Sequence, residues 1–258
     1  MTKNWQKIIK SLHQKKHRTE ENLFLVEGAK SVSELIQNNN KIIKAIDFVI
    51  KGLFYTEEFY NIYAKKLTQL DVYQAIVSEK LLEQNGTLQT NDGALAVVEI
   101  SKIPTNFTLQ NYALALADIR DPGNLGAIIR IADWYGIKEI ICSQTTVDWY
   151  NPKVIIASMG SFLRVKPYYC ELDNFLTSSK SNGYNIYGMF LEGENLHKIE
   201  FAEKGIIVIG NESNGISEEI TKTITNKITI QQFGQAESLN AAMATAVVCD
   251  NLRRCIVK

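Results

Sequence analysis

Three short loops of this 258-residue chain contain side chains that could bind and orient a ligand. The loop DPGNLGAIIR carries Asn124 and Arg130, the loop GNESNG carries Glu212, and the loop AESLNAA carries Ser238 and Asn240. These five residues offer one fixed cation, one carboxylate and three neutral hydrogen-bonding groups. The glycines of the first two loops permit a close approach of the backbone or a positive φ angle. Such a set is suited to a polar ligand.

Each of these residues also has a purely structural explanation when it is taken alone. Arg130 and Asp133 have the spacing of an ion pair on a helix surface. Glu212 precedes a short helix whose first turn favours negative charge. Asn124 and Ser238 are each suited to cap the helix that follows, because their side chains can accept a backbone N–H. A single loop therefore does not identify a site.

The strands and helices expected around the three loops indicate that the loops lie close together. A buried strand precedes each loop (ALALADI, GIIVIG and ITNKITI), and helices are expected at about 125–135 and 238–256. In open α/β sheets, ligands bind outside the carboxyl ends of the strands. Because all three polar clusters fall at that edge, the sequence predicts one shared site. Composition and spacing do not name its ligand.

The hydrophobic pattern predicts two α/β domains. Apolar residues make up 45% of the chain and charged residues 22%, as in soluble globular proteins. Short apolar runs alternate with amphipathic stretches up to about Glu99, and the alternation returns with ALALADI. Between them, SKIPTNFTLQNY lacks periodicity and contains Pro104, as an interdomain linker would. We therefore expect a smaller domain over residues 1–104 and a larger one over residues 105–258.

The charge is unevenly distributed, although 28 basic and 28 acidic residues balance over the whole chain. Zero net charge excludes a protein that is basic over its entire surface. Residues 1–18, however, form an arm with six basic side chains and no acidic one. This basic arm is either a solvated helix face or a patch that meets nucleic-acid phosphates, and the sequence leaves both readings open. Its basic residues are Lys3, Lys7, Lys10, Lys15, Lys16 and Arg18.

Other patterns argue against several classes of protein. The four cysteines show no C-x-x-C spacing and no accompanying histidines, which disfavours a zinc site and favours reduced thiols in the cytoplasm. No apolar run suits a signal peptide or a membrane span. Neither G-x-G-x-x-G nor G-K-[ST] follows a strand, which argues against a nucleotide-dependent oxidoreductase.

Taken together, the three loops resemble the signature motifs of the SpoU/TrmH class of RNA ribose 2′-O-methyltransferases, in the SPOUT superfamily. The steps from Gly210 to Ile230 and on to Leu239 also suit this class, and the resemblance covers most of the chain. The stretch KIIKSLHQKKHRTEENLFLVEGAKSVSELI is similar to the small RNA-binding domain that precedes the catalytic domain in many of these enzymes. The chain departs from the pattern at Gln231, where the family usually has a proline, and this leaves the loop backbone less fixed.

The resemblance implies a fold, a cofactor and a reaction. The catalytic domain would be a mostly parallel α/β fold with a C-terminal trefoil knot, acting as a homodimer in the cytoplasm. Gly210, Ile230 and Leu239 would hold S-adenosylmethionine, whose methyl group would pass to a ribose 2′-hydroxyl. The substrate would be RNA, with large-subunit ribosomal RNA favoured over tRNA because of the added N-terminal domain. The resemblance implies no metal, no DNA and no membrane.

The resemblance also implies roles for the polar residues of the loops. Arg130 would be the key residue, either as a phosphate anchor that stabilises alkoxide charge or as a proton acceptor. Hydrogen bonds would orient Arg130 and the ribose, and they would come from Asn124, Glu212, Ser238 and Asn240.

In the basic arm, Lys15, Lys16 and Arg18 would contact RNA. The alternative reading is a non-catalytic RNA-binding protein that retains the fold.

Overall fold

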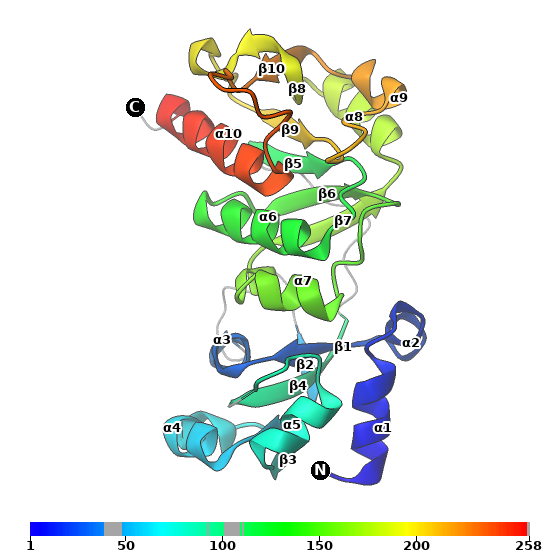
Figure 1. Cartoon of the computed structure of the whole chain (residues 1–258), viewed down its shortest axis with the longest axis vertical. Coiled ribbons are helices and arrows are strands. Elements are labelled where there is room, and N and C mark those ends of the chain that lie inside the picture. Colours follow the sequence, from blue (N-terminus) through cyan, green and yellow to red (C-terminus); the bar gives the residue numbers. More distant parts are fainter. Residues whose placement is uncertain (39–47, 92, 101–108, 110, 257–258) are drawn as a thin grey trace. The chain divides into compact units, whose positions relative to one another are not determined.

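The chain forms two compact units in its computed structural model (Figure 1). One unit contains Met1–Lys102 and Asp148–Leu163, and the other contains Ile103–Val147 and Arg164–Lys258. A segment from the second half of the sequence thus belongs to the first unit. The domain boundary expected between residues 104 and 105 lies outside the described residues. The structure describes residues 1–38, 48–91, 93–100, 109 and 111–256.

The first unit contains a four-stranded sheet in the order β1-β4-β2-β3. β4 pairs antiparallel with β1 and β2, and β3 is the parallel edge strand beside β2. The first five side chains of β4, Ala-Leu-Ala-Val-Val, are all buried, as a central strand requires. The strands are β1 (Leu23–Glu27), β2 (Val49–Tyr55), β3 (Tyr73–Ile76) and β4 (Ala94–Glu99). The N-terminal helices are α1 (Lys3–Ser11), α2 (Lys15–Glu21), α3 (Ala29–Asn38), α4 (Glu57–Leu67) and α5 (Glu79–Asn85).

The returning segment completes the core of the first unit. It contains α7 (Pro152–Ala157), which packs on β1, and the short 3₁₀ helix η1 (Ser161–Leu163). The ring of Phe24 on β1 lies 4.7 Å from the ring of Tyr150 and 6.1 Å from that of Phe162, between ring centroids. Phe24 is fully buried, and this aromatic cluster contributes to its burial.

A buried ion pair also holds the returning segment. Arg18 of α2 is only 3% exposed, and its Nε and Nη2 atoms donate to Asp148 Oδ2 at 3.0 and 2.6 Å. Its Nη1 atom donates to the carbonyl oxygens of Leu12 and His13. Arg18 therefore departs from the expectation that it lies on an RNA-binding surface, because its guanidinium is enclosed by protein acceptors.

The second unit is built on six parallel strands in the order β10-β8-β9-β5-β6-β7. This confirms the expected parallel α/β sheet, whereas the trefoil knot stays a prediction. All side chains of the central strands β5 and β9 are buried, which explains why their sequences are continuously apolar. The strands are β5 (Tyr112–Leu116), β6 (Glu139–Ser143), β7 (Lys166–Cys170), β8 (Asn185–Asn195), β9 (Gly205–Ile209) and β10 (Asn226–Thr229).

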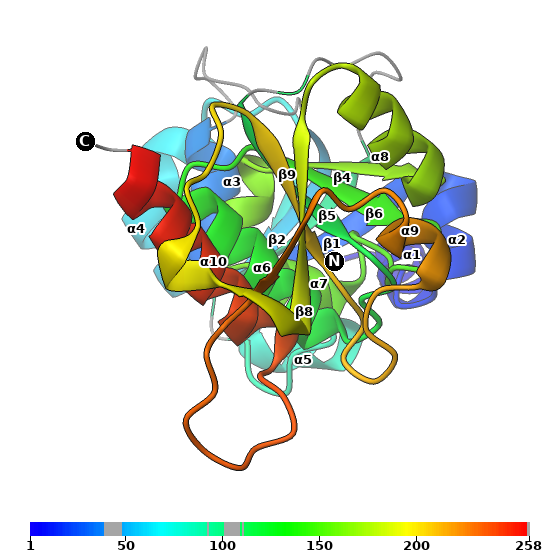
Figure 2. The same cartoon turned by 90° about the horizontal axis from the view of Figure 1, so that it is seen from above.

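Helices cover both faces of this sheet. α6 and α10 lie together on one face, and α8 and α9 lie on the other (Figures 1 and 2). Arg253 Nε on α10 donates to the carbonyl oxygen of Tyr135 at the end of α6, at 2.6 Å. None of the helices in the described ranges is long and apolar enough to cross a membrane. The helical elements are α6 (Pro122–Trp134), α8 (Leu172–Ser181), η2 (Leu196–Lys198), α9 (Glu218–Thr221) and α10 (Ala241–Ile256).

Candidate active site

Side chains from three separate segments, each of which follows a parallel strand, form one hydrogen-bonded polar network at the sheet edge. Asn124 Nδ2 donates to Glu212 Oε1 at 2.6 Å, and Asn240 Nδ2 donates to Asn124 Oδ1 at 2.8 Å. The three loops follow β5, β9 and β10, whose carboxyl ends share one edge because the strands are parallel. The Asn124–Glu212–Asn240 network thus joins residues that are far apart in the sequence, where α/β sheets bind ligands.

Helix capping explains why the Asn124 side chain is available to this network. The N-cap of α6 is Asp121, whose Oδ1 accepts the Asn124 N–H at 2.8 Å. Pro122 occupies the first helical position, where a missing N–H costs no hydrogen bond. The expected capping role of Asn124 is therefore wrong, and its amide reaches the neighbouring loop instead.

Asn240, and not Ser238, occupies the corresponding position at the start of α10. Asn240 Oδ1 accepts the N–H groups of Ala242 at 2.9 Å and Met243 at 3.3 Å, while its Nδ2 serves Asn124. The helix consequently begins at Ala241, three residues later than expected. Ser238 is exposed and forms no hydrogen bond within the described ranges, so the structure does not bring it into the polar network.

Arg130 is exposed on α6 and lies outside the polar network. The ion pair expected between Arg130 and Asp133 does not form. Asp133 pairs with Arg164 instead, whose Nε and Nη2 atoms lie 2.9 and 2.8 Å from Asp133 Oδ2. Among the described residues, Arg130 has no hydrogen-bond or ion-pair partner. A guanidinium in this state can bind a phosphate or a developing oxyanion, because its N–H donors are unused.

The residues expected to hold the cofactor lie on the loops that follow β9 and β10. Gly210 and Ile230 are half-buried, whereas Leu239 is 52% exposed. A side chain at Gly210 has no room, since an added Cβ would stand 2.5 Å from the carbonyl carbon of Gly215. Figure 2 shows the loop between β10 and α10 as a long excursion from the sheet.

The donor groups of that loop fit S-adenosylmethionine. No backbone N–H of residues 231–239 donates a hydrogen bond to any residue that the structure describes. The same loop therefore offers exposed backbone N–H groups and the exposed apolar side chain of Leu239. This combination suits a ligand with polar and apolar parts, such as an adenosine joined to an amino acid.

The basic arm presents fewer cations than its sequence suggests. Lys15 is exposed and forms no ion pair within the described ranges, whereas Lys16 Nζ lies 3.8 Å from Glu20 Oε1. Arg18 is buried against Asp148. Two of the three residues expected to bind RNA, Lys15 and Lys16, are thus on the surface.

Sequence reasoning missed Asn211 and Asp118, which organise the loop that carries Glu212. Asn211 Nδ2 donates to the carbonyl oxygen of Asp118 at 2.7 Å. Asp118 has a positive φ angle of 62°, which is uncommon for a residue other than glycine. The available signal was the asparagine directly after a strand and a glycine, since asparagine there often hydrogen-bonds the backbone of its own turn.

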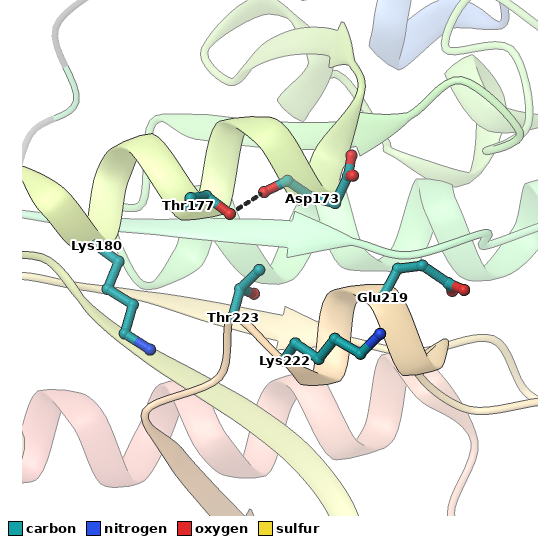
Figure 3. A pocket seen from close by; sticks show the side chains of 6 residues that line it. All are labelled: Asp173, Thr177, Lys180, Glu219, Lys222 and Thr223. Carbon is teal, nitrogen blue, oxygen red and sulfur yellow. Dashed lines mark hydrogen bonds between the residues drawn. The ribbon is translucent and has the colours of Figure 1, made fainter.

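An open hollow of about 370 Å³ lies elsewhere on the second unit, between α8 and α9 (Figure 3). None of the candidate residues lines it. Thr177 Oγ1 on its wall donates to the carbonyl oxygen of Asp173, one helical turn earlier. Its walls mix acids and bases, and they are formed by Asp173, Thr177, Lys180, Glu219, Lys222 and Thr223.

Two family models match the chain. The model of the SpoU rRNA methylase family matches residues 111–250, which include the polar network and Arg130. The model of the MRM3-like substrate binding domain matches residues 5–96.

Individual proteins are similar over nearly the whole chain. The 23S rRNA (guanosine(2553)-2′-O)-methyltransferase of Bacillus subtilis is 27% identical and is matched over 97% of this chain and 95% of its own length. A solved structure from Porphyromonas gingivalis, assigned to the TrmH family, is 31% identical with a TM-score of 0.83, covering 98% of both chains. The AdoMet-bound rRNA methyltransferase of Sinorhizobium meliloti is 27% identical with a TM-score of 0.84, covering 98% of this chain and 95% of that one.

Proposed function

The chain belongs to the SpoU rRNA methylase family, and we propose that it methylates a ribose 2′-hydroxyl of large-subunit ribosomal RNA. It is an RNA methyltransferase that uses S-adenosylmethionine. The observation that carries the proposal is the Asn124–Glu212–Asn240 network, which gathers three motifs at the ligand-binding edge of the sheet. Ribosomal RNA is favoured over tRNA because the Bacillus relative, matched over both units of the chain, is named for 23S rRNA.

S-adenosylmethionine, when bound, supplies an electrophilic methyl group for attack by the ribose oxygen. Gly210, Ile230 and Leu239 would hold it, through backbone groups and apolar contact. Placing the two reactants in line removes much of the entropic barrier to the transfer.

The polar residues of the chain would bind and activate the ribose. Arginine stays protonated at neutral pH, so Arg130 is suited to anchor a phosphate and to stabilise negative charge on the attacking oxygen. Glu212 can accept a hydrogen bond from a hydroxyl. Asn124 holds Glu212 by a hydrogen bond, and Asn240 in turn holds Asn124. Ser238 is exposed and free to bind RNA when the substrate arrives.

We also propose that two copies pair through α6 and α10. Trp134, one turn beyond Arg130 on α6, is 84% exposed, and Met243, three residues after Asn240, is exposed as well. Large apolar side chains that are exposed on two neighbouring helices favour burial in an interface. Trp134→Asp should therefore yield monomers in analytical ultracentrifugation where the unaltered chain sediments as a dimer. A monomeric unaltered chain would contradict the pairing.

Residues 1–104 are proposed as the core of an RNA-binding domain, with Lys15 and Lys16 on its surface, and residues 105–258 as the catalytic domain. The match of residues 5–96 to a substrate-binding domain supports the first assignment. The returning segment Asp148–Leu163 adds to the first unit. We propose a cytoplasmic location, because the enzyme would meet a ribosomal RNA substrate there.

Methyl transfer from labelled S-adenosylmethionine tests the function. The acceptors are ribosomal RNA and tRNA from cells that lack this protein, separated and digested to nucleosides for mass spectrometry. We expect a new 2′-O-methylnucleoside in large-subunit ribosomal RNA, and its loss with Arg130→Ala. A product only in tRNA would contradict the substrate. A chain that binds RNA but neither binds S-adenosylmethionine nor forms product would support the non-catalytic alternative.

A further inference from the structure

Asn211 makes an unusually complete set of contacts for a side chain in a surface loop. Its Oδ1 atom accepts the backbone N–H groups of Ser213 at 2.8 Å and Asn214 at 3.0 Å. Its own backbone N–H and carbonyl exchange hydrogen bonds with Gly215, each at 3.0 Å. These contacts close the loop from residue 211 to 215 into one rigid turn.

The remaining side-chain atom of Asn211 ties this turn to the end of β5. Asn211 Nδ2 donates to the carbonyl oxygen of Asp118 at 2.7 Å. Asp118 is itself fixed, because its N–H donates to Ser143 Oγ at 3.0 Å and its carboxylate pairs with Arg120 at 3.0 Å. Asn211 therefore connects the turn to a point that is anchored on two sides.

Glu212 lies directly inside this turn. Its side chain is exposed, so packing does not fix its direction. The 2.6 Å hydrogen bond to Asn124 requires the turn to present Glu212 towards α6. The tie between Asn211 and Asp118 sets that presentation, because α6 begins only four residues after Asp118.

We infer that Asn211 is a positioning residue that holds Glu212 against Asn124 for methyl transfer. This inference rests on the proposed function. Asn211 touches neither substrate nor cofactor in this role, and it acts through Glu212. A misplacement of about 1 Å at a reacting centre can slow an enzyme roughly 100-fold.

A double-mutant cycle distinguishes positioning from a general contribution to folding. Single-turnover methyl transfer is measured with unmodified large-subunit rRNA transcripts, at saturating RNA and S-adenosylmethionine, for Asn211→Ala, Asn124→Ala and the double variant. We expect Asn211→Ala to slow transfer roughly 100-fold in the unaltered background. In the Asn124→Ala background it should cost less than about threefold, because the contact it serves is already gone. Asn214→Ala, on the same turn, is the matched control, because the Asn214 side chain forms no hydrogen bond within the described ranges.

Amide hydrogen exchange gives a readout that does not depend on activity. The N–H groups of Ser213 and Asn214 should exchange faster in Asn211→Ala than in the unaltered chain, and at unchanged rates in Asn124→Ala. Equal exchange rates in Asn211→Ala and the unaltered chain would overturn the inference, as would equal fold-losses of rate in both backgrounds. An unaltered chain that transfers no methyl group would overturn the proposed function, and the inference with it. An active chain with additive losses would overturn the inference alone.

Discussion

Replacing Asp148 by alanine should destabilise the first unit, because it leaves the Arg18 guanidinium buried without its carboxylate. The Arg18 side chain is 3% exposed and that of Asp148 is 17% exposed. Removing one partner of a buried ion pair costs roughly 3–5 kcal/mol. Arg18 keeps two carbonyl acceptors, and Asp148 is partly hydrated. We therefore expect a loss near the lower end, about 3 kcal/mol.

The expected loss is large enough to measure as a change in melting temperature. A unit of the size of the first one shifts its Tm by roughly 4 °C for each kcal/mol, which predicts a fall of about 12 °C for Asp148→Ala. The chain has three tryptophans, and two of them, Trp5 and Trp149, belong to the first unit. In a Trp134→Phe background, tryptophan fluorescence during heating therefore follows the first unit alone.

Glu20→Ala is the matched control for this experiment, because it breaks the exposed pair between Lys16 and Glu20 on α2. Exposed pairs at this helical spacing contribute only about 0.3–0.5 kcal/mol. The Tm of Glu20→Ala should thus fall by about 2 °C or less. If Asp148→Ala shifts the Tm no more than Glu20→Ala does, Arg18 does not depend on its carboxylate and the reasoning is refuted.

Three further predictions concern pH, RNA and cofactor. Burial raises the pKa of Glu139, which is 6% exposed, against partial opposition from Lys166 and Lys138. The Glu139 carboxyl therefore binds its proton more tightly in the native state than in the unfolded chain, where its pKa is the ordinary 4.5. The stability that this proton contributes is fully present below pH 4.5 and is lost as pH rises through the higher native pKa. Chemical denaturation should accordingly show that Glu139→Gln stabilises the chain more at pH 7 than at pH 3.5, and an equal effect at both would argue against the shift. Charge reversal of Lys15 and Lys16 should weaken RNA binding and reduce its salt dependence without changing S-adenosylmethionine affinity; unchanged RNA binding in filter assays would make this helix face merely solvated. Gly210→Ala should lower S-adenosylmethionine affinity at least about tenfold by calorimetry, because its Cβ would force the turn open; an unaltered Kd would remove Gly210 from the cofactor site.

The arrangement of the second unit was accessible from the sequence because long-range structure there follows from a simple rule. Strands such as β5 and β9 are continuously apolar, as buried parallel strands must be. Once they are parallel, their following loops lie at one edge, and Asn124, Glu212 and Asn240 meet there. The pattern of hydrophobicity therefore predicted the place of the polar network without any knowledge of its hydrogen bonds.

The sequence did not predict which of two chemically similar residues would cap a helix or form an ion pair. Asp121 and Asn124 are both good helix caps, and a difference of three residues decides which amide is left for the network. Asp133 could pair with Arg130, three residues earlier, or with Arg164, which is distant in sequence. In the structure it pairs with Arg164. Arg18 looks like its lysine neighbours in the sequence, but its planar, multidentate donor group suits a buried carboxylate.

The return of Asp148–Leu163 to the first unit also determines when that unit can finish folding during synthesis. A ribosome delivers the chain from the N-terminus at about 5–20 residues per second, and roughly 60 residues separate β4 from the end of η1. For several seconds, Phe24 on β1 has no Tyr150 or Phe162 to cover it, and Arg18 has no Asp148. The nascent N-terminal segment therefore exposes an apolar surface, which the finished unit buries, until the β6–β7 connection emerges.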